Sequence, residues 1–149
     1  MKKLFILLLI PSFAFAGWSV GYTSFDGDLG DGDSISLGGI NAGYKWENIQ
    51  ETDFSVQAGF AFGISDDTFE GVDVELDTSY YLKGTYDIND TFFISANWVR
   101  LEATVSAGNL SDSASDNEAG FGFGFNVGKV TLMFDFIEDT DLFSIQYNF

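Results

Sequence analysis

Apolar and polar side chains alternate along most of the chain, and Gly, Asp and Asn occur where the alternation stops. A period of two places successive side chains on opposite faces of an extended strand, and no helix satisfies that period. The alternating segments predict eight strands, at residues 18–23, 34–46, 54–65, 72–86, 91–105, 121–127, 130–136 and 141–149. The sequence therefore predicts an all-β, antiparallel protein.

The last predicted strand shows the pattern clearly. Its apolar face carries Phe143, Ile145, Tyr147 and Phe149, and its polar face carries Ser144, Gln146 and Asn148. One face suits lipid and the other a polar interior. An unpaired backbone amide or carbonyl in hydrocarbon costs several kcal/mol, so a sheet inside a membrane must close on itself. We therefore expect an eight-stranded transmembrane up-and-down β-barrel.

The fifth predicted strand changes phase. Its apolar residues lie at even positions up to Trp98 and at odd positions from Leu101 onward. A β-bulge inserts one extra residue and re-aims the following side chains. The phase change predicts such a bulge near Val99 and Arg100.

The breaks between strands differ in length. Residues 47–52, 87–90 and 128–129 form short connections, whereas 26–33, 66–71 and 107–117 form mostly longer ones rich in Gly, Asp and Ser. Short periplasmic turns and longer outer loops are typical of such barrels. The pattern predicts periplasmic termini, although the last outer loop, at 138–141, is short.

The first sixteen residues are typical of an export signal. Lys2 and Lys3 precede an apolar run at residues 4–10, and Ala14-Phe15-Ala16 has the small-x-small pattern of a cleavage site. The run is shorter than the about 20 residues that a membrane-spanning helix needs, which disfavours a retained anchor. We expect a cleaved signal peptide at 1–16 and a barrel domain at 17–149.

The inward faces of the predicted strands carry charges. The expected lumen network comprises Lys45, Lys83, Arg100, Asp73, Glu75, Asp77, Glu102 and Asp135. Isolated buried ions are costly, so these charges should pair. An eight-stranded barrel is just wide enough for side chains to fill it, which favours a filled lumen over an ion pathway.

Composition narrows the partners. The chain has 6 Lys and Arg against 23 Asp and Glu, and its few basic residues are scattered, which argues against nucleic acid. It has no cysteine for a disulfide framework. It also has no histidine, and Asp or Glu alone is a poor base for activating a hydroxyl nucleophile at neutral pH, so we expect no enzyme and no cofactor.

Metal binding is a secondary hypothesis. Clustered carboxylates on a loop suit hard cations such as calcium. The candidate ligands are Asp26, Asp28, Asp31 and Asp33. They lack EF-hand spacing and the closing Glu, so a solvated acidic loop is the favoured alternative to a weak site. Divalent ions bridging the acidic loops to lipopolysaccharide is a related hypothesis.

The signal, the eight alternating strands and the tail from Phe143 to Phe149 together resemble small outer-membrane barrels of the OmpA and OmpX type. The resemblance implies location in the bacterial outer membrane, contact with its lipid and lipopolysaccharide, and recognition of the tail by the barrel-assembly machinery. Family members act as structural proteins, adhesins, serum-resistance factors or small pores. Three functions remain open: a structural or surface-interaction barrel, a small cation-preferring pore, and a soluble lipocalin-like barrel that binds lipid.

Overall fold

The computed structural model describes residues 17–149 except 31, 32, 48, 70 and 139. It contains one 3-10 helix, η2 (Ile49–Glu51), and ten strands in one antiparallel sheet. The strands are β1 (Trp18–Gly30), β2 (Asp33–Trp46), β3 (Phe54–Gly63), β4 (Asp66–Phe69), β5 (Val72–Leu76), β6 (Thr78–Asp87), β7 (Phe92–Ala107), β8 (Leu110–Val127), β9 (Val130–Ile137) and β10 (Thr140–Asn148). No helix among the described residues is long and apolar enough to cross a bilayer.

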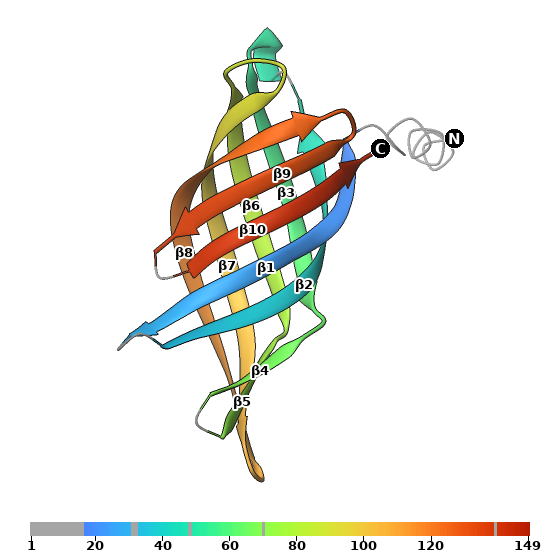
Figure 1. The fold of residues 1–149 in the computed structure, drawn as a ribbon. Coiled ribbons are helices and arrows are strands. Elements are labelled where there is room, and N and C mark those ends of the chain that lie inside the picture. Colours follow the sequence, from blue (N-terminus) through green and yellow to red (C-terminus); the bar gives the residue numbers. More distant parts are fainter. Residues whose placement is uncertain (1–16, 31–32, 48, 70, 139) are drawn as a thin grey trace, which may run out of the picture.

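Eight strands close into a barrel, as the alternation predicts (Figure 1). They are β1, β2, β3 and β6 to β10, and the ring is completed where β1 pairs with β10 and β7 pairs with β8. The remaining strands, β4 and β5, form a hairpin between β3 and β6, and β5 pairs with β7 beyond the end of β6. The predicted eight-stranded antiparallel barrel is confirmed.

The two faces of the sheet differ in the way the alternation predicts. On β10, for example, Ile145 and Tyr147 are exposed on the outward face, whereas Ser144 and Gln146 are buried inside the barrel. On β7, Ile94 and Trp98 point outward and Ser95 and Asn97 point inward. Most of the barrel therefore has an apolar outer surface and a polar interior.

The two ends of the barrel are unequal. The end where the described chain starts at Gly17 and finishes at Phe149, which we call the terminal end, has the short connections around η2, at 88–91 and at 128–129. At the opposite end, which we call the hairpin end, the strands extend further (Figure 1). The expected loops at 26–33 and 107–117 are wrong in large part, because β1 runs to Gly30, β2 starts at Asp33 and β8 starts at Leu110. Cross-strand pairing satisfies these backbone groups in place of water.

The predicted bulge at Val99 and Arg100 is wrong. β7 pairs with β8 in one unbroken register from Phe92 to Ala107. The extra residue lies on the neighbouring strand, because Tyr80 pairs with Arg100 but Leu76 pairs with Ala103. Three residues, 77–79, thus oppose two, 101–102, at the junction of β5 and β6.

Candidate functional site

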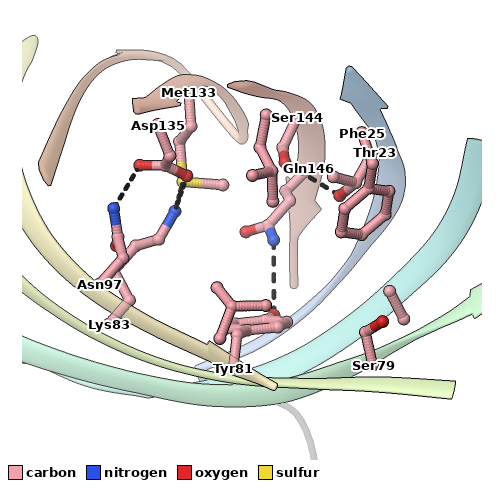
Figure 2. Close-up of a pocket in the computed structure, with 13 residues that line it drawn as sticks. Thr23, Phe25, Ser79, Tyr81, Lys83, Asn97, Met133, Asp135, Ser144 and Gln146 are labelled. Carbon is pink, nitrogen blue, oxygen red and sulfur yellow. Dashed lines mark hydrogen bonds and ion pairs between the residues drawn. The ribbon is translucent and has the colours of Figure 1, made fainter. Parts of the chain in front are cut away.

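A buried ion pair crosses the middle of the barrel. The Nζ of Lys83, on β6, lies 2.6 Å from the Oδ2 of Asp135, on β9. The other carboxylate oxygen accepts a hydrogen bond from the Nδ2 of Asn97 at 2.7 Å (Figure 2). It accepts another from the Oγ of Ser95 at 3.1 Å. A buried charge is tolerated where it is paired and its remaining hydrogen bonds are made.

A second network of neutral groups lies beside the ion pair. Gln57 donates to Gln146 at 3.0 Å, and Gln146 donates to Asn41 at 3.0 Å. Asn41 donates in turn to Thr23 at 2.6 Å, whose hydroxyl lies 2.9 Å from that of Ser144. These hydrogen bonds connect β1, β2, β3 and β10. A further one, from Gln146 to the hydroxyl of Tyr81, adds β6 as the fifth strand. The interior is held by side-chain hydrogen bonds rather than left as an open tube.

The predicted charge network is only partly assembled. Of its eight members, Lys83 and Asp135 meet inside the barrel. Lys45 faces inward at the terminal end and lies 3.6 Å from Glu47. The placement of Arg100 and Glu102 in the lumen is wrong: Arg100 pairs with outward-facing Tyr80, and its Nε lies 2.9 Å from the carboxylate of Glu102 on the same outward face.

The placement of Asp73, Glu75 and Asp77 in the lumen is wrong as well. All three side chains are exposed. Glu75 pairs with Thr104 on the outward face of β7, and the Thr104 hydroxyl donates to Asp77 at 2.7 Å. The extra residue at 77–79 reverses the facing of β5 relative to β6, so the acids point outward and Leu76 points inward.

Apolar side chains close the interior at the hairpin end. A buried cluster is formed by Phe25, Leu37, Ala61, Leu76, Val99, Ile137 and Leu142, which we call the apolar seal. Its members come from seven strands, and their side chains point into the barrel. Leu101 and Val74 pack against it from the hairpin side. The sequence analysis expected polar lumen contents and missed this seal.

The described residues enclose a small space and a larger one in the interior. A small cavity of about 30 Å³ lies between the apolar seal and the ion pair, lined by residues such as Ser79 and Val99 (Figure 2). A larger polar space of about 250 Å³ lies toward the terminal end, bordered by Lys45, Gln57 and Thr131. The barrel is therefore hollow toward its termini and closed toward its long hairpins.

Glycines at inward positions make room for the large interior side chains. A Cβ added at Gly43 or at Gly59 would meet the hydroxyl of Tyr81, and one added at Gly122 would meet the carboxylate of Asp135. Inward glycines opposite an aromatic or charged residue are thus the sequence signal of the interior packing, and the sequence analysis did not use it.

Beyond the barrel, β4, β5, β7 and β8 continue as a sheet that we call the protruding sheet (Figure 1). On β5 and β7 its outward face is polar, with Glu75, Glu102 and Thr104, and its inward face is apolar, with Val74 and Leu101 leading down to the seal. On these two strands the polarity is the reverse of that on the barrel wall, whereas β8 adds Asp112 and Asp116 to the inward face. Its β8 strand is the most exposed part, and Leu110 at the tip is 78% exposed.

Of the four candidate metal ligands, Asp26 alone has a side chain among those that the structure describes. Asp26 is exposed on β1, and the backbone of Asp28 pairs with Ser34 in the β1–β2 hairpin. Asp31 lies outside the described residues, as do the side chains of Asp28 and Asp33. Within the described part of the chain, no group of three or more acidic side chains is arranged to hold a metal ion.

The tail residues lie on the outward face of β10. Ile145, Tyr147 and Phe149 are exposed, and Phe143 packs against Phe134 of β9. The backbone N–H of Phe149 donates to the carbonyl of Trp18, so the last residue is held in the closing pair of strands. The proposed recognition signal is accessible in the folded barrel.

Comparisons with known proteins agree with this architecture. Residues 13–134 match the family model described as outer membrane protein beta-barrel domain. Ail, the attachment invasion locus protein of Yersinia pestis, is 19% identical, with a TM-score of 0.55 over 91% of this chain and 100% of Ail. A structure of Ail in complex with the heparin analogue sucrose octasulfate is 18% identical, with a TM-score of 0.56 over 89% and 97% of the two chains.

Neisserial surface protein A is also similar, with 14% identity and a TM-score of 0.51 over 89% of this chain and 96% of the other. None of the curated protein sequences compared with this chain matches it. A family match over most of the chain, together with a closed eight-stranded barrel that is apolar outside, places the outward face in lipid. The chain belongs to the outer membrane protein beta-barrel domain family and is a protein of the bacterial outer membrane.

Proposed function

We propose that this barrel presents the protruding sheet at the cell surface for interaction with an extracellular partner, and that it neither catalyses a reaction nor transports solutes. The observation that carries the proposal is the contrast between the two ends of the interior. The apolar seal closes the hairpin end, while the protruding sheet extends beyond it with exposed polar strands. Loops and strand extensions on a rigid barrel are where such proteins carry binding function.

A small cation-preferring pore is the less favoured reading. Its lining acids were expected to be Asp73 and Asp77, and both side chains point outward, away from the lumen. A dry apolar constriction opposes the passage of ions because it offers no groups to replace their hydration. A lipocalin-like barrel is disfavoured by the apolar outer surface, since a soluble barrel needs the opposite facing.

The proposal includes a cleaved signal peptide at 1–16 and termini that lie in the periplasm. With the termini in the periplasm, the protruding sheet lies outside the cell, which is where a surface partner would meet it. Two proteins of similar fold, the attachment invasion locus protein Ail and Neisserial surface protein A, are named for attachment and for the cell surface, which supports the proposed surface role. Protease added to intact cells should cleave near Leu110 and leave the short connections at 88–91 uncut.

The test is a shortened hairpin. Ala103 and Ala114 pair opposite each other on β7 and β8, so residues 104–113 can be replaced by an Asn-Gly turn without breaking the barrel. Cells carrying this variant should keep a heat-modifiable barrel and lose the surface phenotype of the intact protein, scored as adhesion and serum resistance. An unchanged phenotype, or steady conductance of the intact protein in planar bilayers, would overturn the proposal.

A further inference from the structure

The polar space at the terminal end of the interior, which we call the terminal space, is too large to be a site for a single water molecule. Its volume is about 250 Å³, several times the roughly 30 Å³ that one water molecule occupies in the liquid. This volume lies just below the roughly 300–1,000 Å³ of sites for drug-sized ligands. The buried side chains of Phe93 and Met133 add apolar surface to its border. The terminal space therefore has room for a molecule about the size of one amino acid.

The hydroxyl of Thr85 borders the terminal space and has no hydrogen-bond partner among the described residues. Thr85 is only 4% exposed, so its hydroxyl is shielded from bulk water. A buried polar group without a partner costs free energy, which a polar ligand in the space would recover. Two amides on the same border are already engaged: Asn126 accepts from Thr131 at 2.8 Å, and Asn148 donates to Thr131 at 2.8 Å. The Thr85 hydroxyl is thus a hydrogen-bonding group available to a ligand.

The ammonium of Lys45 is a second group available to a ligand. Its Nζ lies 3.6 Å from the carboxylate of Glu47, which is beyond hydrogen-bonding distance. The Glu47 side chain is 63% exposed, and an ion pair with an exposed partner contributes little to stability. A lysine ammonium has three N–H donors. An anionic group that enters the terminal space can therefore bind Lys45 at little cost to the fold.

Carboxylates gather outside Lys45. A neighbouring space of about 270 Å³, which we call the mouth, shares Lys45 and Glu47 with the terminal space. Asp53, Asp87 and Asp90 also border the mouth. From the interior outward, the border thus changes from neutral polar groups to one cation and then to several anions.

We propose that the terminal space binds a small zwitterion of the amino-acid type, with its carboxylate against Lys45 and Thr85 and its ammonium toward Glu47. An amino acid carries both charged groups on one carbon, so a single molecule can contact the loosely paired Lys45 and Glu47 together. Its side chain would lie against Met133 and Phe93. This site lies at the opposite end of the barrel from the protruding sheet, and it goes beyond the proposed surface function. With the termini in the periplasm, the ligand would enter from that compartment.

The charges favour a zwitterion over an ion of either sign. An anion would be repelled by the carboxylates of the mouth and by the formal net charge of −17. A cation would be drawn to the mouth but would meet the ammonium of Lys45 at the entrance to the terminal space. A zwitterion that enters with its carboxylate first places each of its charges beside an opposite one.

The probe is L-leucine, titrated into the full barrel labelled with ¹⁵N in lipid nanodiscs. It should cause saturable shifts of the amide signals of Lys45, Glu47 and Thr85, and it should leave those of Ser113 and Ser115 at the hairpin end unmoved. N-acetyl-L-leucine has no ammonium and L-leucinamide has no carboxylate, so each should bind at least about tenfold more weakly. The absence of saturable shifts, or equal binding of either analogue, would overturn the inference.

Thr85→Val removes the hydroxyl at nearly constant shape and should weaken L-leucine binding about tenfold. The midpoint of urea unfolding should not fall, because the lost hydroxyl has no partner in the described structure. Ser55→Ala is the matched control. Ser55 pairs with Thr85 across β3 and β6, and its hydroxyl also lacks a described partner, but it is not among the residues that border the terminal space. Unchanged binding by Thr85→Val, or an equal loss in Ser55→Ala, would contradict the proposed site.

Lys45→Met tests the charge pattern. This variant should lose the preference for L-leucine over L-leucinamide, because the group that binds the carboxylate is gone, and a retained preference would overturn the assignment of Lys45. The shortened hairpin described above should bind L-leucine as the unmodified protein does. The surface function and the terminal site can therefore fail independently of each other.

Discussion

The ammonium of Lys83 lies 2.6 Å from the carboxylate of Asp135, and both side chains are buried inside the barrel. Removing one partner leaves the other as an uncompensated charge in a poorly solvated interior. Asp135→Asn should therefore lower the free energy of unfolding by about 3–5 kcal/mol. Urea unfolding of the barrel refolded in lipid vesicles, followed by tryptophan fluorescence, measures the effect. The double variant with Lys83→Met and Asp135→Leu should lose less, and a single variant as stable as the parent would contradict the prediction.

Tyr81 depends on the absence of a side chain at Gly43. A methyl group there would meet the tyrosine hydroxyl, so Gly43→Ala should cost about 1–3 kcal/mol of unfolding free energy. Adding Tyr81→Phe removes the clashing oxygen and should recover part of that loss, which a double-mutant cycle detects as a coupling of at least about 0.5 kcal/mol. Gly84→Ala is the control, because the added methyl meets only the ring of Phe54. Additive effects of the two changes would refute the packing explanation.

The apolar seal should keep the barrel electrically silent. Leu76→Ser combined with Leu142→Ser replaces two buried members of the seal by small polar groups that can hold water. This variant should conduct in planar bilayers where the parent does not. Leu82→Ser, on the outward face, should stay silent. Replacing Asp73 and Asp77 should have no effect on conductance, because neither side chain lines the lumen.

We expect the stability of the contact between β2 and β4 to depend on pH through the carboxyl group of Asp67. Hydrogen bonds from the backbone N–H groups of Ser36 and Thr68 lower the pKa of its carboxyl below the ordinary 3.8. A lowered pKa in the folded state means that the carboxylate stabilises the β2–β4 contact above the ordinary pKa, and that this contribution is lost as pH falls through the lowered value. The amide signals of Ser36 and Thr68 should titrate together below 3.8 and stop titrating in Asp67→Asn. A midpoint above 3.8 would contradict the assignment.

The proposed recognition role of the tail can be tested separately from its contribution to the stability of the fold. The ring of Phe149 is exposed, while its backbone N–H holds the closing strand pair through Trp18. Phe149→Ala keeps that hydrogen bond, so refolding into detergent should be unchanged. Insertion in the presence of the barrel-assembly machinery should be several-fold slower if the ring is the recognition signal. Equal slowing in both assays would show that the residue acts on folding alone.

The pairing of Lys83 with Asp135 shows what the sequence could predict about the interior of the barrel. Alternation predicted that both side chains face inward, because the facing of a side chain along one strand follows from its parity. The cost of an isolated buried ion predicted that Arg100 would find a partner, but it did not single out Glu102. The predicted bulge placed this pair in the lumen, whereas the unbroken strand puts it on the outward face. Which charges meet across a lumen depends on strand tilt and stagger, since these set the height of each residue in the barrel.

Around Asp77 and Arg100, the sequence alone did not predict which side chains face inward. On β7 the apolar positions change phase with no bulge, because the apolar residues turn from lipid to the seal as the strand leaves the membrane. Along β5 and β6 the pattern keeps its phase, and the extra residue at 77–79 reverses the backbone to give the same result. The sequence by itself determined the closed, alternating barrel and its place in a membrane. The tertiary structure alone decided which way each face points at the hairpin end, because a period of two reports that two faces differ, and only the register with neighbouring strands orients them.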